Sequence, residues 1–249
     1  MILDQKGFVR EVQYKPPEDP HGYPFNLNVL NGFERLKLNS KVTFLVGENG
    51  SGKSTLIEAI AIAYGFNAEG GSLHLRFSTK DSSSELHRYL TLIRTVNRAK
   101  NGYFLRAESF YNVATQIEDL DSMPAPAPKI IDSYGGKSLH EQSHGESFLS
   151  LMNNRFSGRG FYILDEPEAA LSAERQLSFL LRLHELVEAE SQFIIATHSP
   201  IILSYPDSTI YSIEDEGIVK RDYEDTEQYQ FTKMFINDYK RILYRLLKN

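Results

Sequence analysis

The segment that most constrains this chain is GENGSGKST, residues 47–55, which fits the phosphate-binding pattern G-x-x-x-x-G-K-[ST]. The apolar, β-branched run Val42–Val46 precedes it and predicts a buried parallel strand. A helix over Thr55–Tyr64 is expected to follow. In such a strand–loop–helix arrangement, the glycines let consecutive backbone N–H groups face phosphate oxygens, and the helix N-terminus adds partial positive charge. The segment therefore predicts binding of a nucleoside triphosphate.

The residue types of this loop assign individual roles. Lys53 is expected to reach the β- and γ-phosphates, and Ser54 to offer its hydroxyl to Mg²⁺. The alternative is a glycine turn that only resembles the motif, which the flanking strand and helix disfavour. The residues predicted to contact the nucleotide are Gly47, Asn49, Gly50, Ser51, Gly52, Lys53, Ser54 and Thr55.

Length and composition fit one globular α/β domain. The 249 residues are 41% hydrophobic, which is enough for a sizeable core. No apolar run approaches eighteen residues and the N-terminus lacks a signal-peptide core, so we expect a cytoplasmic protein without an integral membrane segment. Zero cysteines exclude disulfides and thiolate metal sites. The net charge of −6 argues against a uniformly basic surface but leaves room for a local basic groove.

The first part of the chain predicts an opening strand over 7–14 and then an irregular loop rich in Pro and Gly. Tyr23 or Phe25 could fold back to stack on a base. The favoured alternative is that these aromatic side chains pack the loop onto the sheet.

The middle of the chain is polar and uneven. Ser84 is a suitable N-cap for a helix over 85–98, and the run Tyr103–Ala107 predicts a strand. The alternating prolines of 123–128 predict a short extended linker. Neither internal repeats nor sustained heptads are visible.

A second apolar run, FYILDEP at 161–167, ends in two acids. If it forms a parallel strand beside the phosphate loop, both carboxylates lie at the carboxyl edge of the sheet. We assign Asp165 to the metal and Glu166 to the attacking water, which it would orient or deprotonate. The alternative, a strand end that simply meets solvent, is weakened by the neighbouring phosphate loop.

A third strand, over 192–197, ends at His198. A helix over 173–189 separates it from Asp165, and right-handed βαβ geometry would bring both strand ends to one edge. His198 could then donate a hydrogen bond to the γ-phosphate. Taken alone, a histidine at a strand end is more often structural.

Together these motifs resemble those of the ABC-type ATPases, with GENGSGKST, FYILDEP and ATHSP as the matching elements. The signature peptide of that family is represented by SHGES at 143–147, which leads into an apolar helix from Phe148 to about Phe156. The resemblance implies an α/β P-loop NTPase fold: a mainly parallel sheet flanked by helices, an N-terminal antiparallel β portion and a helical signature subdomain. It also implies ATP and Mg²⁺ as cofactors.

By the same resemblance, Lys53, Glu166 and His198 would be catalytic. Ser143 and Gly145 would contact the γ-phosphate of ATP bound to the opposite subunit of a homodimer formed in the ATP state.

Three departures from the family pattern concern the site. The signature reads QSHGE rather than LSGGQ, so His144 and Glu146 replace a glycine and a glutamine. The D-loop reads AALS at 169–172 and lacks the usual aspartate. The Q-loop residue that would approach the metal is ambiguous, with Glu108 preferred and Gln116 the alternative.

The sequences of these motifs resemble those of the soluble branch of the family, which includes chromosome-maintenance, RecF-type repair and defence-associated ATPases. About ninety residues separate Lys53 from Ser143, without heptads, so long coiled-coil arms are excluded. We expect a compact head: one domain over 1–249, with an inserted helical and signature lobe over about 67–157. Its favoured role is motor or sensor of a repair or defence complex. A transporter nucleotide-binding subunit and a weakly hydrolysing, ATP-dependent scaffold are the alternatives.

The C-terminal segment predicts a hairpin over 209–221 and then an amphipathic helix over 229–247. The favoured expectation is that this helix packs on the ATPase core. The alternative is a docking surface for a partner protein or nucleic acid. Its apolar stripe is Phe231, Phe235, Tyr239, Ile242 and Leu246, and its basic residues are Lys233, Lys240, Arg241, Arg245 and Lys248.

Overall fold

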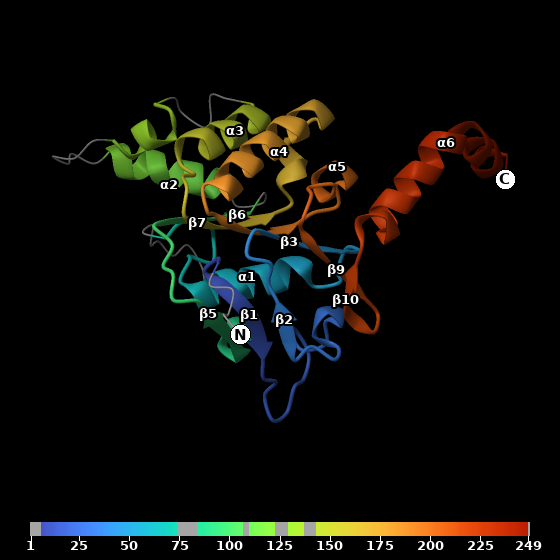
Figure 1. The fold of residues 1–249 in the computed structure, drawn as a ribbon, viewed down its shortest axis with the longest axis horizontal. Helices are drawn as coiled ribbons and strands as arrows, with labels where there is room; N and C mark the ends of the chain where they lie inside the picture. Colours follow the sequence, from blue (N-terminus) through green and yellow to red (C-terminus); the bar gives the residue numbers. More distant parts are fainter. Residues whose placement is uncertain (1–5, 74–83, 107–109, 123–128, 137–142, 249) are drawn as a thin grey trace.

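A computed structural model describes residues 6–73, 84–106, 110–122, 129–136 and 143–248. Its central sheet has seven strands in the order β10-β9-β3-β8-β7-β6-β4 (Figure 1). The five strands from β9 to β6 run parallel, while β10 and β4 pair antiparallel at the two edges. The strands are β3 Val42–Gly47, β4 Gly71–Ser72, β6 Asn101–Arg106, β7 Gly160–Asp165, β8 Gln192–Ala196, β9 Thr209–Glu214 and β10 Gly217–Arg221.

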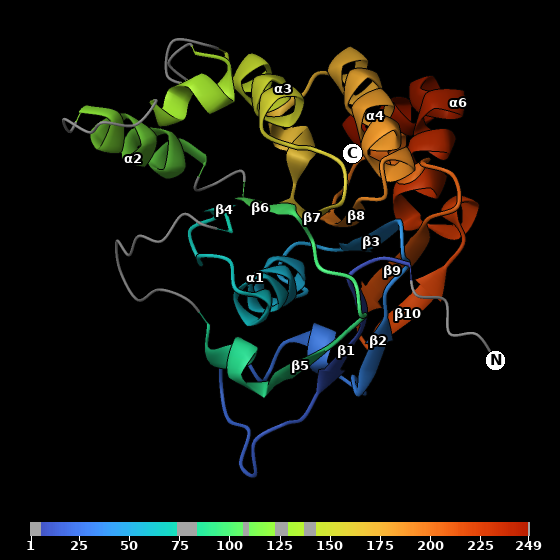
Figure 2. The same ribbon diagram turned by 60° about the vertical axis from the view of Figure 1, so that its left-hand side comes forward.

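Layers on both faces bury this sheet. Every residue of β3, β7 and β8 is buried, which explains why these strands are continuous apolar runs rather than alternating ones. Figures 1 and 2 show α2, α3 and α4 on one face, and α1 with a second sheet on the other. Alternate strand residues therefore enter two separate hydrophobic clusters, as Phe44 and Leu45 do.

The second sheet is antiparallel, in the order β2-β1-β5, with bounds β1 Val9–Tyr14, β2 Arg35–Lys37 and β5 Leu90–Arg94. The prediction of a helix over 85–98 is wrong here. Ser84 does cap a helical turn by accepting a hydrogen bond from Leu86 N, but this turn is a 3₁₀ segment that ends at Tyr89. The chain then forms β5 by pairing with β1. Hydrogen bonds to the backbone of β1 outweigh the local helix propensity of this segment.

Helices α1, α4 and α6 begin and end within two residues of their predicted positions, whereas α2 was not predicted from the sequence. The signature helix α3 starts earlier than expected, directly after Ser143. Among the described residues, no helix is both long and apolar enough to cross a membrane. The helices are α1 Lys53–Tyr64, α2 Phe110–Ser122, α3 His144–Asn154, α4 Ala173–Glu188, α5 Pro200–Leu203 and α6 Glu227–Leu247.

The C-terminal helix α6 contradicts the expectation that it packs on the core. None of its residues is buried, and Figure 1 shows it projecting beyond the β9–β10 edge of the sheet. A kink at Asp238, with φ −138°, bends it midway. Amphipathicity predicted the helix correctly but not what its apolar face would contact.

The range 67–157 contains two kinds of structure. β4 and β6 belong to the central sheet and β5 to the antiparallel sheet. Helices α2 and α3, with a 3₁₀ turn at Ile130–Tyr134, lie together on one face of the central sheet. The division into a core and an inserted lobe stays a prediction.

Candidate functional site

The phosphate loop joins β3 to α1 in a conformation that needs its glycines. Gly47, Gly50 and Gly52 have φ values of 151°, 82° and 99°. A Cβ at Gly47 would lie 2.8 Å from the backbone oxygen of Ile213, so a side chain is also excluded by contact. The loop curls tightly and delivers the chain to the first residue of α1, Lys53.

Lys53 is buried at the centre of this loop. Its Nζ donates hydrogen bonds to Gly47 O and Glu48 O, both at 2.8 Å. Burial lowers the pKa of the Lys53 ammonium, while the nearby carboxylates of Glu166 and Asp165 act in the opposite direction. The ammonium is thus held between two backbone oxygens and next to carboxylates.

The end of β7 meets the start of α1. Ser54 Oγ donates a hydrogen bond to Asp165 Oδ1 at 3.2 Å, although 111 residues separate the two. Asp165 is only 6% exposed. Ser51 Oγ is also buried in the loop and has no hydrogen-bond partner among the described residues, so it is a polar group that a bound phosphate could satisfy.

Two acids that follow Asp165 connect the ends of β7 and β8. Glu166 N donates to Ala196 O at 3.0 Å, and Glu168 Oε1 accepts a hydrogen bond from His198 N. Glu166 adopts a left-handed conformation, with φ 52°, which is uncommon for a residue with a side chain and is often found at functional sites. The Glu166 carboxylate lies 3.6 Å from His198 Nε2. The predicted convergence of these two residues is present.

The signature peptide caps α3. Ser143 and Glu146 form a reciprocal capping box: Ser143 Oγ accepts from Glu146 N, and Glu146 Oε2 accepts from Ser143 N at 3.1 Å. Ser143 Oγ also donates to Glu146 Oε2 at 2.8 Å. This hydrogen bond, and then the one from Ser143 N, lower the pKa of the Glu146 carboxyl, and Arg175 lowers it further. Gly145 is buried against the D-loop segment, since a Cβ there would lie 2.8 Å from Ala170 O.

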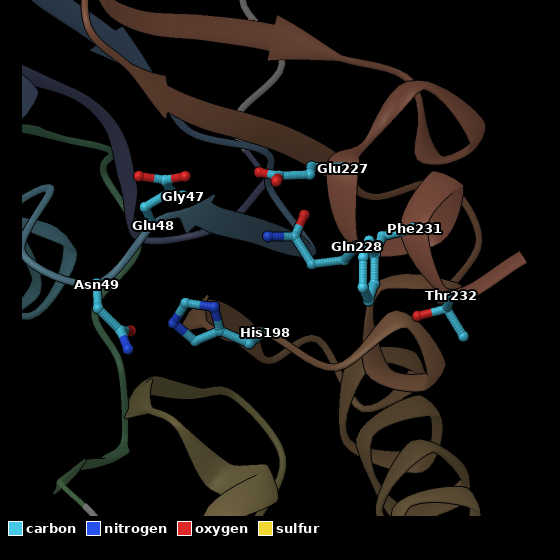
Figure 3. Close-up of a pocket in the computed structure, with 8 residues that line it drawn as sticks. All are labelled: Gly47, Glu48, Asn49, His198, Glu227, Gln228, Phe231 and Thr232. Carbon is cyan, nitrogen blue, oxygen red and sulfur yellow. The ribbon is translucent and has the colours of Figure 1, made fainter. Parts of the chain in front are cut away.

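A pocket of about 510 Å³ opens beside the phosphate loop (Figure 3). Glu48 and Asn49 form one side of it, His198 lies between, and the first two turns of α6 form the other side. The Nε2 atom of His198 and the Oε1 atom of Gln228 are buried and lack hydrogen-bond partners in the part of the chain that the structure describes. Its lining residues are Gly47, Glu48, Asn49, His198, Glu227, Gln228, Phe231 and Thr232.

Tyr23 and Phe25, the two aromatic residues considered for stacking on a base, have different surroundings. Phe25 packs edge-on against Tyr89, with ring centroids 5.2 Å apart, and so fixes the loop to the core. Tyr23 is 64% exposed, and its hydroxyl lies 3.4 Å from Thr55 Oγ1 beside the phosphate loop. The Q-loop candidate Glu108 lies outside the described residues. Gln116 belongs to α2.

Two residues near the motifs were missed from the sequence. Arg175, on the first turn of α4, donates to Ser143 Oγ at 3.3 Å and pairs with Glu146 at 3.4 Å. Glu168 anchors the backbone of His198. The third acid of DEPE was a visible signal for Glu168, whereas nothing in the sequence places Arg175 beside the signature.

Comparison with known proteins finds similarity to ATP-binding proteins. A family model described as an AAA domain matches residues 25–122. The tungstate uptake system ATP-binding protein of Campylobacter jejuni is 26% identical over 213 residues, covering 78% of this chain and 64% of that protein. A ribose import ATP-binding protein of Escherichia coli O157:H7 is 27% identical over 212 residues, covering 78% and 39% respectively.

The solved structure of cbiO1 from Clostridium perfringens, part of the ABC transporter complex cbiONQ, shares the fold. It aligns with a TM-score of 0.50 and 17% identity, covering 97% of this chain and 99% of that one. The chain is thus similar in sequence to ATP-binding proteins of uptake systems and shares its fold with an ABC transporter ATPase. The chain spans about two fifths to two thirds of the length of the curated relatives described above.

Proposed function

We propose that this chain binds ATP with Mg²⁺ and hydrolyses it, and that two copies close head to tail around two ATP molecules. The observation that carries the proposal is the convergence of three strand ends. Ser54 contacts Asp165, and Glu166 lies 3.6 Å from His198, all beside the phosphate loop. A buried lysine, paired oxygen ligands and a carboxylate next to an imidazole are the groups that phosphoryl transfer to water requires.

The residues present fit Mg²⁺ held jointly with ATP. Ser54 Oγ and Asp165 Oδ1 are two oxygen atoms already within 3.2 Å of each other, and Mg²⁺ prefers oxygen ligands. No cluster of three His, Asp or Glu side chains able to hold a metal is found in the described ranges. The ion would therefore depend on phosphate oxygens and water for its remaining ligands. When bound, it neutralises charge on the β- and γ-phosphates.

In the proposed reaction a water oxygen attacks the γ-phosphorus, and the bond between the γ-phosphorus and the β–γ bridging oxygen breaks. The products are ADP and inorganic phosphate. Glu166 accepts the proton of the attacking water. Lys53 attracts the γ-phosphate oxygens, and His198 donates a hydrogen bond to one of them. The contacts of Glu166 N with Ala196 O and of Glu168 with His198 N hold the base and the imidazole in position.

Ser143 and Gly145 would act on ATP bound to the other subunit. In their own chain they contact α4 and the D-loop segment, through Arg175 and Ala170. Ser143 is exposed at the N-terminus of α3, where its hydroxyl and backbone N–H groups suit a γ-phosphate supplied from outside. This arrangement supports a two-fold symmetric dimer, in which each site is completed by the partner.

The favoured setting is a cytoplasmic motor or sensor of a repair or defence complex, as a compact head without coiled-coil arms. A transporter subunit is the second candidate, because the curated relatives are named as import ATP-binding proteins. Purification in a complex with integral membrane proteins from native cells would favour the transporter. The scaffold alternative predicts tight ATP binding with turnover close to zero.

The decisive variant is Glu166→Gln, which keeps the shape of the side chain but removes the base. We expect turnover to fall by about 10²–10⁴-fold, the usual contribution of a general base. ATP should then hold the variant as a dimer, because the γ-phosphate contacts persist. Phosphate release measures the first effect, and light scattering with ATP and Mg²⁺ at micromolar protein measures the second.

Glu190→Gln is the matched control, since Glu190 is an exposed glutamate away from the loop, and it should leave turnover unchanged. Normal hydrolysis by Glu166→Gln would overturn the assignment of the base. A variant that stays monomeric with ATP would overturn the head-to-tail dimer.

A further inference from the structure

Helix α6 presents apolar side chains that no other described part of its own chain covers. It is 21 residues long, none of its residues is buried, and Ile236, Leu246 and Leu247 are 67%, 68% and 81% exposed. Basic side chains alternate with them, so the helix is amphipathic rather than simply polar. A face of this kind marks a surface that another element covers.

The position of α6 connects this face to the candidate site. Its first two turns line the pocket beside the phosphate loop, opposite Glu48 and Asn49 and next to His198 (Figure 3). In the proposed dimer, the signature of the other subunit approaches the loop from outside. The rest of α6 extends away from the core (Figure 1).

Helix α4 carries a second exposed stripe that begins beside the signature. Leu177 and Leu181 are 59% and 65% exposed, and their spacing of four residues places them on one face. Glu174, Glu185 and Glu188 extend the same stripe and are exposed. The first turn of α4 contacts the signature through Arg175 and Ser143. The stripe therefore starts at the surface that faces the other subunit.

The two stripes complement each other in charge and in apolar character. On α6, positions 233 and 236 lie on one face before the kink at Asp238, and positions 240, 243 and 247, spaced by three and four, lie on one face after it. They are Lys233, Ile236, Lys240, Leu243 and Leu247. Lysines alternate with apolar residues there, while carboxylates flank a leucine pair on α4. Such a match favours pairing of the two helices and sets their register.

We infer that, in the ATP-bound dimer, α6 of each subunit packs across α4 of the other subunit and clamps the two heads together. This inference rests on the proposed head-to-tail dimer. Within one chain the two helices are separated in Figure 1, so the pairing is between subunits. The partner that fits α6 is thus a second copy of this chain. ATP binding brings α4 of one copy to α6 of the other, and hydrolysis releases both.

The test uses the full chain carrying Glu166→Gln, with ATP and Mg²⁺. Because the natural chain has no cysteine, Leu181→Cys and Ile236→Cys introduce the only two thiols. A short bismaleimide should convert this protein into a covalent dimer with ATP and not without it. The control pairs Ile236→Cys with Leu120→Cys, an exposed leucine on α2, and should give no covalent dimer.

A second measurement does not depend on the geometry of a cross-link. Leu177→Glu combined with Leu181→Glu should raise the dimer dissociation constant at least tenfold in the Glu166→Gln background. Both leucines are exposed, so the variant should keep its far-ultraviolet circular dichroism spectrum. Leu120→Glu is the matched control and should leave the dissociation constant unchanged.

The outcomes separate the inference from the function on which it rests. If Glu166→Gln stays monomeric with ATP, the proposed dimer fails and the α6–α4 pairing fails with it. A second outcome is that the protein dimerises without forming the cross-link, and with a dissociation constant that Leu177→Glu and Leu181→Glu leave unchanged. In that case the dimer stands and the pairing is overturned. A cross-link within one chain also overturns the pairing. So does binding of duplex DNA without ATP, if Lys240→Glu abolishes this binding but leaves the dimer dissociation constant unchanged.

Discussion

Gly50 and Gly52 have similar backbones but different surroundings. Both lie in the left-handed region, with φ values of 82° and 99°. A Cβ at Gly50 would have no atom within 4 Å, whereas at Gly52 it would lie 2.7 Å from Cγ1 of the fully buried Val29. The loop thus needs a glycine at one position for conformation alone, and at the other for conformation and space.

This difference predicts distinct costs for the same substitution. Gly50→Ala should lower the free energy of unfolding by about 1–2 kcal/mol, the cost of a left-handed non-glycine residue. Gly52→Ala should cost a further ~1–3 kcal/mol, because Val29 is stiff and the added methyl overpacks the core. Urea unfolding without nucleotide measures both. Equal losses for the two variants would contradict the role of Val29.

The contacts of Glu146 give a physical reason why the signature peptide has a glutamate where a glutamine is usual. It occupies the N3 position of α3, where a glutamate completes the capping box with Ser143. Arg175 pairs with its carboxylate at 3.4 Å, so the charge at this position is partly balanced by α4. The departure from glutamine thereby joins the signature helix to the helix that follows the D-loop.

Helices α4, with 16 residues, and α6, with 21, are both amphipathic but differ in how far their apolar side chains are buried. Phe179 on α4 is fully buried between the signature helix and the sheet, while Phe231 on α6 is 60% exposed. The substitution Phe179→Ala should therefore lower the free energy of unfolding by about 3–5 kcal/mol. Phe231→Ala should change it by no more than about 0.5 kcal/mol. Thermal or urea unfolding of the nucleotide-free protein measures both, and a large loss for Phe231→Ala would contradict an unpartnered α6.

How far the sequence predicts each element depends on where its stabilising contacts lie. The strands at 42–47, 160–165 and 192–196 were predictable because burial on both faces leaves an unbroken apolar run. The segment 85–98 was not, because its state is decided by pairing with β1, far away in the sequence. The conformation of α6 was predictable from its periodicity, but its surroundings were not, since an apolar face does not specify what covers it.

At the scale of the molecule, the candidate site depends on the order of strands rather than on any one element. β3, β8 and β7 are neighbours, so the phosphate loop, His198 and Asp165 share one edge although they come from distant parts of the chain. The motifs predicted this convergence through the βαβ rule. Contacts made by long side chains, such as Arg175 with Ser143, were not predictable, because they depend on distances between helices that no local pattern encodes.

The core also predicts how the whole molecule responds to alkaline pH. Burial raises the pKa of Tyr103 well above its usual range, and it raises the pKa values of Tyr64, Tyr134 and Tyr162. These phenols stay protonated in the folded state when they would ionise in the unfolded chain. Their contribution to stability is thus fully present below about pH 10 and is lost as the pH rises through the folded pKa values.

We therefore expect cooperative unfolding above pH 10, with the late part of tyrosine ionisation at 295 nm coinciding with loss of circular dichroism at 222 nm. Tyr103→Phe removes the most strongly shifted phenol, so its drop in unfolding free energy between pH 9 and pH 11 should be smaller than that of the natural chain. Comparing this drop within each protein cancels any pH-independent effect of the lost hydroxyl. Complete ionisation near pH 10 with the helical signal intact would contradict the expectation, because the buried phenols would then be open to solvent in the folded state.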